Sequence, residues 1–457
     1  MIQPALIKSE LRPMLRIAIP VVLAELGWMF MGVVDTMMVG PLGPEAIAAV
    51  GVGNSMHMAF TIFGMGLLLG LDTLVSQSFG ARQVAACHLW LAHGVVLALL
   101  LTPLIMIGCG LLYFSIPSLG FHSQVRPLLE RYFAVIIWTT PFLLFYAAFR
   151  RYLQGIHAVT PVMVALVSAN VVNAVFNWIL IYGHVGFPAL GVAGSAWATL
   201  IARFYMAAVL LIAIVLHDRW RRSDLAAMAI RRTALKRLIA LGFPAAWTVA
   251  LEVGVFAAAT MLSGMLTPVA AASHQIALYI AAVSFMIPLG LSSAGAVRVG
   301  HAVGALEPRR AAAAGWTAIF LGVAFTTTAA ILFLIAPRAL IGLFSRQENV
   351  LVLGSTLLFV AAVFQLFDGL QGVATGVLRG LGDTRTPMIT NLAAHWLFGL
   401  PVGYNLCFNF GWGVIGLWIG LSTGLIIAGV VLVWFWNRRI HAFQHTLSAP
   451  VPVDLVY

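Results

Sequence analysis

Twelve long apolar segments constrain this chain most, because each is close to the length that crosses a lipid bilayer. A membrane-spanning helix needs about 20 apolar residues at ~1.5 Å of rise per residue, and its backbone groups must find partners inside the same helix. Short connections join the segments through all 457 residues. We predict an all-α polytopic membrane protein with spans at 14–39, 46–70, 88–115, 128–149, 160–182, 190–216, 238–262, 271–294, 311–336, 350–376, 388–408 and 413–436.

The charged residues support this prediction and set the orientation. They make up only 9% of the chain, whereas a soluble domain carries about 25%. The net charge of +11 does not indicate a nucleic-acid partner, because Lys and Arg collect in the cytoplasmic loops of membrane proteins. With the N-terminus in the cytoplasm, every Lys and Arg falls inside except Arg203, which lies within a span, and the outer Arg126, Arg131, Arg338 and Arg346. We expect both termini to be cytoplasmic and the protein to lie in the cell inner membrane.

The chain contains an internal duplication. An offset of 224 residues aligns Pro20 with Pro244, Gly66 with Gly290 and Gly80 with Gly304, so the repeat unit is six spans. An even number of spans leaves both copies in the same orientation, as parallel repeats related by an axis along the membrane normal. We predict two six-helix lobes around a central cavity: residues 1–217, a basic cytoplasmic linker 218–237, residues 238–437 and a cytoplasmic tail 438–457.

The few acids within the spans are the strongest functional candidates. A charged carboxylate at the bilayer centre costs about 2.5–3.5 kcal/mol or more, so it normally faces a cavity or a partner. The acids are not duplicated with the fold: Asp35 aligns with Ala259, and Glu252 aligns with Trp28. The lobe that holds Glu252 and Asp368 has two acids that can share a proton or hold Na⁺, whereas Asp35 stands in the other lobe.

Other interpretations of the acids stay open. An interhelical hydrogen bond is the alternative for Glu252 and Asp368, and a cap or interfacial role is the alternative for Asp35. Glu25 either lines the cavity or pairs with an Arg or His. We expect Asp72, near a cytoplasmic end, to be structural and paired with Arg82.

Several longer motifs resemble those of one transporter family. The segments IPVVLAELGWMFMGVVDTMMVGPLG, LDTLVSQSFGA, NVVNAVFNWILIYG, LEVGVF, SHQIAL and FDGLQGVATGVLRGLGDTRTP, which span nearly the whole chain in order, resemble the multidrug and toxic compound extrusion (MATE) transporters, nearest to the NorM-like branch. The resemblance implies a twelve-helix, two-lobed antiporter that expels organic cations, including drugs, while Na⁺ or H⁺ enters.

The resemblance also implies roles for individual residues. By motif, Glu252 and Asp368 are similar to the cation-coupling acids of the family, and Asp35 to its substrate-side acid. Cavity contacts to the substrate are implied for the positions Ser55, Phe256 and Gln275.

Two positions depart from patterns known in the family. Phe285 occupies the place where some relatives use a tyrosine near the cation. Asn177, four residues after Asn173, stands where a second branch of the family carries an aspartate, which argues against proton coupling through the first lobe.

Two rival functions are less well supported. A flippase for lipid-linked saccharides or another amphipathic anion needs a basic cavity, but the charges within the spans are mainly acidic. An intramembrane enzyme or quinone-binding subunit needs a catalytic or ligand constellation, and Cys87, Cys109 and Cys407 form no CxxC pair. We therefore expect no enzyme and no cofactor beyond the coupling ion, but a monomer that binds small organic cations and the lipid bilayer.

Overall fold

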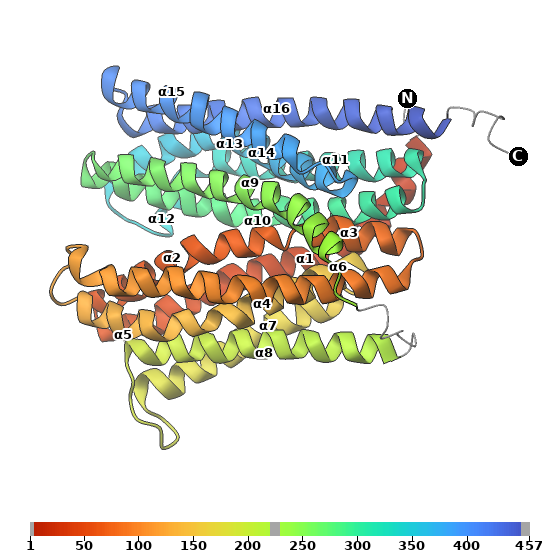
Figure 1. The fold of residues 1–457 in the computed structure, drawn as a ribbon. Helices are drawn as coiled ribbons and strands as arrows, with labels where there is room; N and C mark the ends of the chain where they lie inside the picture. The colour runs from red at the N-terminus through yellow and green to blue at the C-terminus, as the bar shows by residue number, and fades with distance from the viewer. Residues whose placement is uncertain (1–3, 220–228, 449–457) are drawn as a thin grey trace, which may run out of the picture. The chain divides into compact units, whose positions relative to one another are not determined.

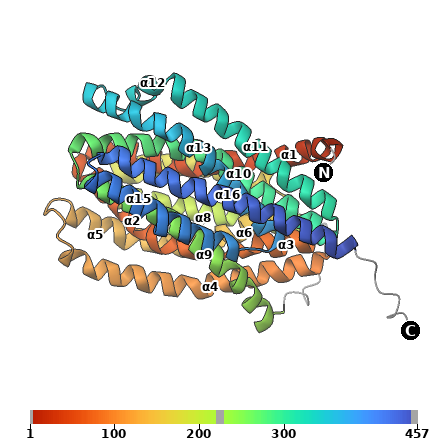
Figure 2. The ribbon, with the colours of Figure 1, turned by 90° about the horizontal axis from the view of Figure 1, so that it is seen from above.

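The structure is a computed structural model that describes residues 4–219 and 229–448. Within these ranges the chain is helical and contains no strand. Eleven helices are long and apolar enough to cross a membrane. Figure 1 shows helices running side by side, and Figure 2 shows the same helices from above. The predicted all-α fold is confirmed.

The helices of the first repeat follow the predicted spans. A break at Leu68 and Leu69 divides the second span, and the 3₁₀ turn η3 (Ile137–Thr139) divides the fourth. Proline starts α2, where its missing N–H would have no partner in any case. The helices are α1 (Pro4–Val39), α2 (Pro44–Leu67), α3 (Gly70–Gly80), α4 (Val84–Ser115), α5 (Arg126–Ile136), α6 (Thr140–Gly155), α7 (Thr160–Tyr182) and α8 (Val192–Arg219).

The second repeat has the same order of spans. Proline again opens α10 and α11, and the Thr267 hydroxyl accepts a hydrogen bond from the backbone N–H of Ala270 to cap α10. The α-helices are α9 (Arg232–Gly264), α10 (Pro268–Gly304), α11 (Pro308–Ile335), α12 (Pro337–Gly342), α13 (Glu348–Leu381), α14 (Arg385–Asn391), α15 (Leu400–Tyr404) and α16 (Gly413–Ser448).

The predicted span 388–408 does not form one long α-helix. It consists of α14, the π-helical η5 (Leu392–Gly399), α15 and the π-helical η6 (Asn405–Asn409). For this reason eleven rather than twelve long α-helices are found in the described ranges. The π-helix is rare and occurs often at functional sites.

The chain divides into two compact units that do not coincide with the two repeats. One unit contains residues 23–75 and 83–246, and the other contains 1–22, 76–82 and 247–457. The divisions within α1 and α9 fall shortly after Pro20 and Pro244 and are one repeat offset apart. We call these units the Asp35 unit and the Glu252 unit after their acids. The predicted linker 218–237 includes residues 220–228, and the predicted tail includes 449–457, which both lie outside the described residues.

Each unit uses a glycine of its second span to hold the first half of a divided helix. In the Asp35 unit, a Cβ atom on Gly66 would lie 2.5 Å from the Cα of Ala246. In the Glu252 unit, a Cβ atom on Gly290 would lie 3.0 Å from the Cα of Val22. These two contacts are equivalent under the repeat, so the duplicated glycines are explained by close backbone approach.

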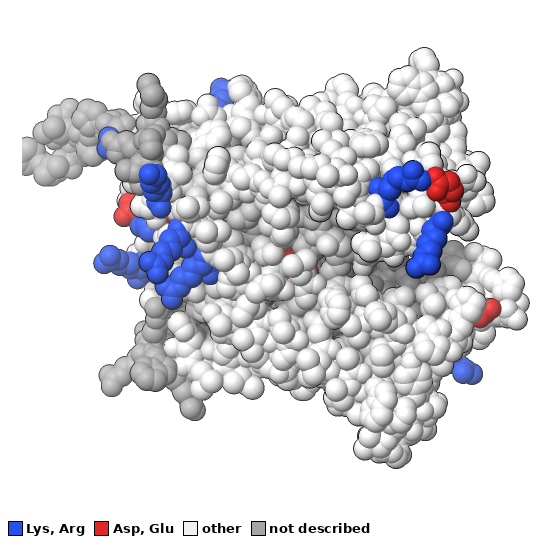
Figure 3. Space-filling view, turned by 180° about the vertical axis from the view of Figure 1, so that it is seen from behind, with Lys and Arg blue, Asp and Glu red and all other residues white. Residues whose placement is uncertain are grey.

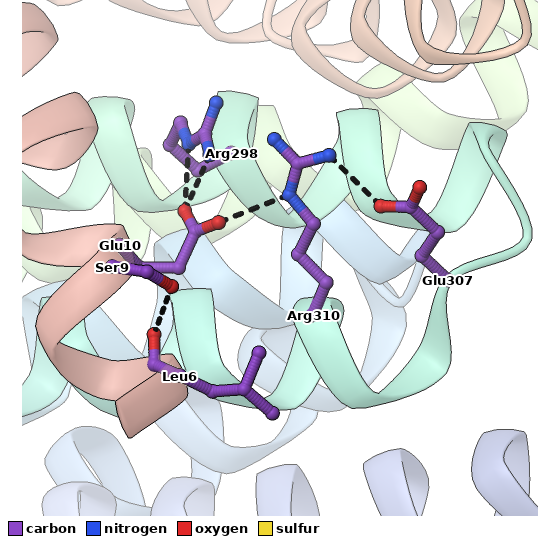
Figure 4. A network of polar contacts seen from close by, with 6 residues as sticks. All are labelled: Leu6, Ser9, Glu10, Arg298, Glu307 and Arg310. Atoms are coloured by element: carbon purple, nitrogen blue, oxygen red, sulfur yellow. Dashed lines mark hydrogen bonds and ion pairs between the residues drawn. The ribbon is translucent and has the colours of Figure 1, made fainter. Parts of the chain in front are cut away.

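A buried ion cluster fastens the start of α1 within the Glu252 unit (Figure 4). Glu10, only 3% exposed, accepts hydrogen bonds from Arg298 of α10 at 3.0 Å through Nε and from Arg310 of α11 at 3.0 Å. Arg310 also contacts Glu307 at 2.8 Å. Loss of one partner from such a buried pair leaves an uncompensated charge, so the cluster holds this segment in place.

Charged side chains are unevenly distributed along the helices. On the face drawn in Figure 3, Lys and Arg lie mostly toward the left and right sides, and the middle of the face is almost free of them. A surface of this kind suits apolar lipid in its middle and water at its ends.

Candidate functional site

The Glu252 unit brings three predicted coupling residues into one region. Glu252 lies on α9 and is half-buried, whereas Asp368 on α13 is 4% exposed. Gln371, which follows Asp368 by about one turn of α13, donates to Glu252, so α9 and α13 meet at these two acids. A Cβ atom on Gly372 would lie 2.9 Å from the ring of Phe285, so this ring packs against α13 one turn beyond Asp368.

These two acids have few polar partners. Glu252 accepts one side-chain hydrogen bond, from Gln371 Nε2 at 3.3 Å. In the part of the chain that the structure describes, Asp368 has no hydrogen bond or ion pair. The alternative of a satisfied interhelical hydrogen bond therefore finds no support for Asp368. Both carboxylates keep oxygen atoms free for a ligand.

Three further residues around Glu252 were missed by the sequence analysis. Gln371 Nε2 also lies 3.4 Å from Asn391 Oδ1 at the end of α14. The indole of Trp396, in the π-helical η5, donates to the backbone oxygen of Leu251 at 3.1 Å. Gln371 follows Asp368 by three residues in the motif FDGLQG, and this helical spacing was the available signal. No sequence signal indicated that Asn391 of α14 and Trp396 of η5 lie beside this group.

The Asp35 unit surrounds its acid with donors. Asp35 is 7% exposed. Its Oδ1 accepts from Asn173 Nδ2 at 3.0 Å and from Asn177 Nδ2 at 2.7 Å. Its Oδ2 accepts from Thr199 Oγ1 at 3.1 Å. The structure thus joins three of the predicted residues, and Thr199 of α8 completes the group without having been predicted.

A buried arginine lies one turn beyond Thr199. Arg203, 4% exposed, donates to the hydroxyl of Thr139 at 2.5 Å. Its guanidinium carbon lies 5.9 Å from the ring centroid of Trp28, within the range of a cation–π interaction. Arg203 therefore lies in the same unit as Asp35, one helical turn from Thr199, which donates to that acid.

The remaining predicted substrate contacts lie on three helices. The Ser55 hydroxyl donates to the Gly51 oxygen of its own helix at 2.8 Å, and Gln275 is exposed on α10. Phe256 packs edge-on against Phe364, with 5.9 Å between ring centroids. These positions stay predictions, because no bound molecule is present to test them.

The other two acids form ion pairs inside the Asp35 unit. Glu25 pairs with Arg150 of α6, and both side chains are buried. This answers the open question about Glu25 in favour of a partner. Asp72 lies 3.4 Å from Arg151, a partner that the sequence analysis did not name. Both pairs connect helices that are distant in the sequence and so contribute to the packing of the unit.

Comparison with known proteins identifies the family of the chain. The MatE family model matches residues 20–179 and 244–405. A probable multidrug resistance protein NorM of Mesorhizobium japonicum is 35% identical over 94% of this chain and 94% of its own. A multidrug resistance protein NorM of Burkholderia vietnamiensis is 35% identical over 93% of both chains.

Solved structures match the fold. The crystal structure of a eukaryotic MATE transporter, AtDTX14, has a TM-score of 0.85 at 23% identity and covers 97% of this chain and 100% of its own. A MATE crystal structure in a bent conformation has a TM-score of 0.87 at 20% identity and covers 97% of this chain and 99% of its own.

Proposed function

Because the chain belongs to the multidrug and toxic compound extrusion (MATE) family, we propose that it is an antiporter that exports organic cations, several drugs among them, in exchange for inward Na⁺ or H⁺. The chain is a polytopic membrane protein and a transporter rather than an enzyme. The NorM relatives, whose names describe multidrug resistance, support the substrate class. The distribution of Lys and Arg supports an orientation in the inner membrane with both termini in the cytoplasm.

The free carboxylates of the Glu252 unit carry this proposal. Glu252 has one weak donor and Asp368 has no side-chain partner among the described residues. Charged groups at this depth are costly unless they are paired or serve transport. A monovalent cation supplies the missing partner. We assign the coupling ion to these two acids.

In the proposed mechanism the same acids control release of the substrate. In the outward-facing state, Glu252 and Asp368 take up the entering ion and lose their net attraction for an organic cation. Neutralised acids favour release of the substrate outside and return to the inward-facing state. Ion and substrate compete for the acids, and the two units alternate access to the two sides of the membrane.

Asp35 is proposed as the acid on the substrate side. Its carboxylate already accepts three hydrogen bonds, so it acts on a cation mainly through its remaining charge and not as a free ligand. We expect a smaller contribution to substrate affinity from Asp35 than from Glu252 or Asp368.

Drug efflux from proteoliposomes, with Na⁺ and pH gradients imposed separately, tests the proposed function. We expect at least one gradient to drive efflux by the wild type, and Glu252→Gln and Asp368→Asn to reduce that efflux to near background. Glu348→Gln is the matched control, because this glutamate is exposed and pairs with Arg338. Wild-type efflux in both acid variants would refute the coupling assignment, and efflux driven by neither gradient would refute the antiport.

A further inference from the structure

Two glutamines flank Asp368 on the buried face of α13. Gln365 and Gln371 lie three residues before and three residues after Asp368, so each side chain is a neighbour of this carboxylate on the helix surface. Gln365 and Gln371 are both 0% exposed. The spacing therefore places one buried amide on each side of the acid.

The amides are poorly satisfied. Among the residues that the structure describes, neither Oε1 nor Nε2 of Gln365 has a hydrogen-bond partner, and Oε1 of Gln371 has none either. An unpaired buried polar group costs about 1–3 kcal/mol, and such groups in native proteins usually indicate a missing water, ion or functional role. Because Gln371 directs Nε2 toward Glu252, its carbonyl oxygen remains open to a ligand.

Amide oxygens next to two carboxylates suit a dehydrated alkali cation. Such an ion needs several oxygen ligands to replace its hydration shell, whereas a proton needs a single acceptor oxygen. Phe285, whose ring packs on α13 at Gly372, offers no hydroxyl here. Oxygen ligands beyond the carboxylates must therefore come from elsewhere, and Gln365 and Gln371 are placed to supply them.

We propose that Gln371 and Gln365 are ligands of the coupling ion and that their oxygens make this site select Na⁺ over H⁺. This inference rests on the proposed function, since it assumes that Glu252 and Asp368 bind the coupling ion. Gln371 contributes more than Gln365, because its Nε2 already holds it against Glu252.

The test measures Na⁺ binding by thermal unfolding of the purified protein in detergent, with NaCl titrated against choline chloride. A ligand that binds only the folded state raises the unfolding temperature, and the stabilisation grows with the logarithm of its concentration divided by Kd. We expect Na⁺ to stabilise the wild type, and Gln371→Met to raise the Na⁺ concentration for half-maximal stabilisation about tenfold. Gln365→Met is expected to raise it about threefold.

Two features of the design keep the test decisive. The side chain of Gln365 makes no hydrogen bond within the described part of the chain, so Gln365→Met should fold at least as well as the wild type without Na⁺ and still bind Na⁺ more weakly. This variant therefore decides the matter if Gln371→Met does not fold. Gln154→Met is the matched control, because Gln154 is a 1% exposed glutamine of the Asp35 unit, and its half-maximal Na⁺ concentration should equal that of the wild type.

Three results would overturn the inference. The first is equal Na⁺ affinity in the wild type and both glutamine variants. The second is an equal loss of affinity in Gln154→Met. The third is the absence of any Na⁺ effect on a wild type whose efflux is driven by a pH gradient, which would leave the proposed antiport intact. Failure of both gradients to drive efflux would instead refute the proposed function itself.

Discussion

Asp35 and the pair Glu252 and Asp368 occupy the two units of a duplicated chain, but their surroundings are opposite. Asp35 accepts three side-chain hydrogen bonds. Glu252 has a single donor at 3.3 Å, and Asp368 has none among the described residues. A satisfied buried carboxylate contributes to stability, whereas an unsatisfied one is retained at a cost. The comparison separates an acid whose oxygens already have partners from acids whose oxygens are left open for the proposed ligand.

The largest effect on stability is expected at Asp35. Asp35→Asn removes the charge that three donors share and leaves one acceptor oxygen where the carboxylate offers two. We expect a loss of about 3 kcal/mol in the free energy of unfolding, because buried partners are left unpaired. Thermal unfolding in detergent measures it. An unchanged unfolding temperature would mean that the donors do not stabilise the acid.

A second acid next to Asp35 would give the Asp35 unit two neighbouring carboxylates, as in the Glu252 unit. Asn177→Asp replaces the closest donor, at 2.7 Å, by a carboxylate, and like charges at this range disfavour joint ionisation. We expect a loss of about 2 kcal/mol at neutral pH, which decreases as the pH falls and one of the two acids binds a proton. Unfolding measured from pH 8 to pH 5 tests this. Asn173→Asp is the companion variant, and a loss independent of pH in both would contradict the explanation.

Thr199 tests the contribution of one donor. Thr199→Val keeps the shape of the side chain but removes the hydroxyl that lies 3.1 Å from Asp35 Oδ2. We expect about 1 kcal/mol of destabilisation. Thr327→Val is the control, because the Thr327 hydroxyl is exposed and donates only to its own helix. Equal effects in the two variants would show that the bond to Asp35 adds nothing.

The smallest change, and one of opposite sign, is expected at Asp368. Asp368→Asn removes a buried charge without breaking a side-chain hydrogen bond, so the unfolding free energy in Na⁺-free buffer should stay the same or rise by about 1 kcal/mol. Efflux should be lost in the same variant. A destabilisation as large as that of Asp35→Asn would remove the distinction between the two units.

Much of the fold could be predicted because its signals are local. A run of apolar residues identifies a span wherever it lies, and a constant offset identifies a repeat from residues such as Pro20 and Pro244. The π-helical course of the span at 388–408 could not be predicted in this way, because composition and length are the same for an α-helix and a π-helix. The division of α1 between two units depends on which helices pack against each half.

The candidate site was predictable in part for the same reason. Asn173 and Asn177 are four residues apart, so the sequence places them on one helix face, but their common partner Asp35 lies 138 and 142 residues away. Arg150, the partner of Glu25, likewise could not be identified from the sequence, because it lies 125 residues away. The acids could be identified from the sequence because charge is rare in apolar spans. Gln365 and Gln371 carry no charge, so this signal does not identify them.

The sequence by itself determined the helical membrane fold, the duplication and the presence of a few acids within the apolar spans. Hydrophobic length, repeat offset and buried charge are properties of single segments, so they need no knowledge of neighbours. Only the tertiary structure decided which acid is satisfied and which is open. That outcome depends on how each helix is rotated about its axis and on which distant helix faces it. Helices that are apolar on nearly all sides have little hydrophobic periodicity, so their sequences indicate neither the rotation of the helix nor the helix that it faces.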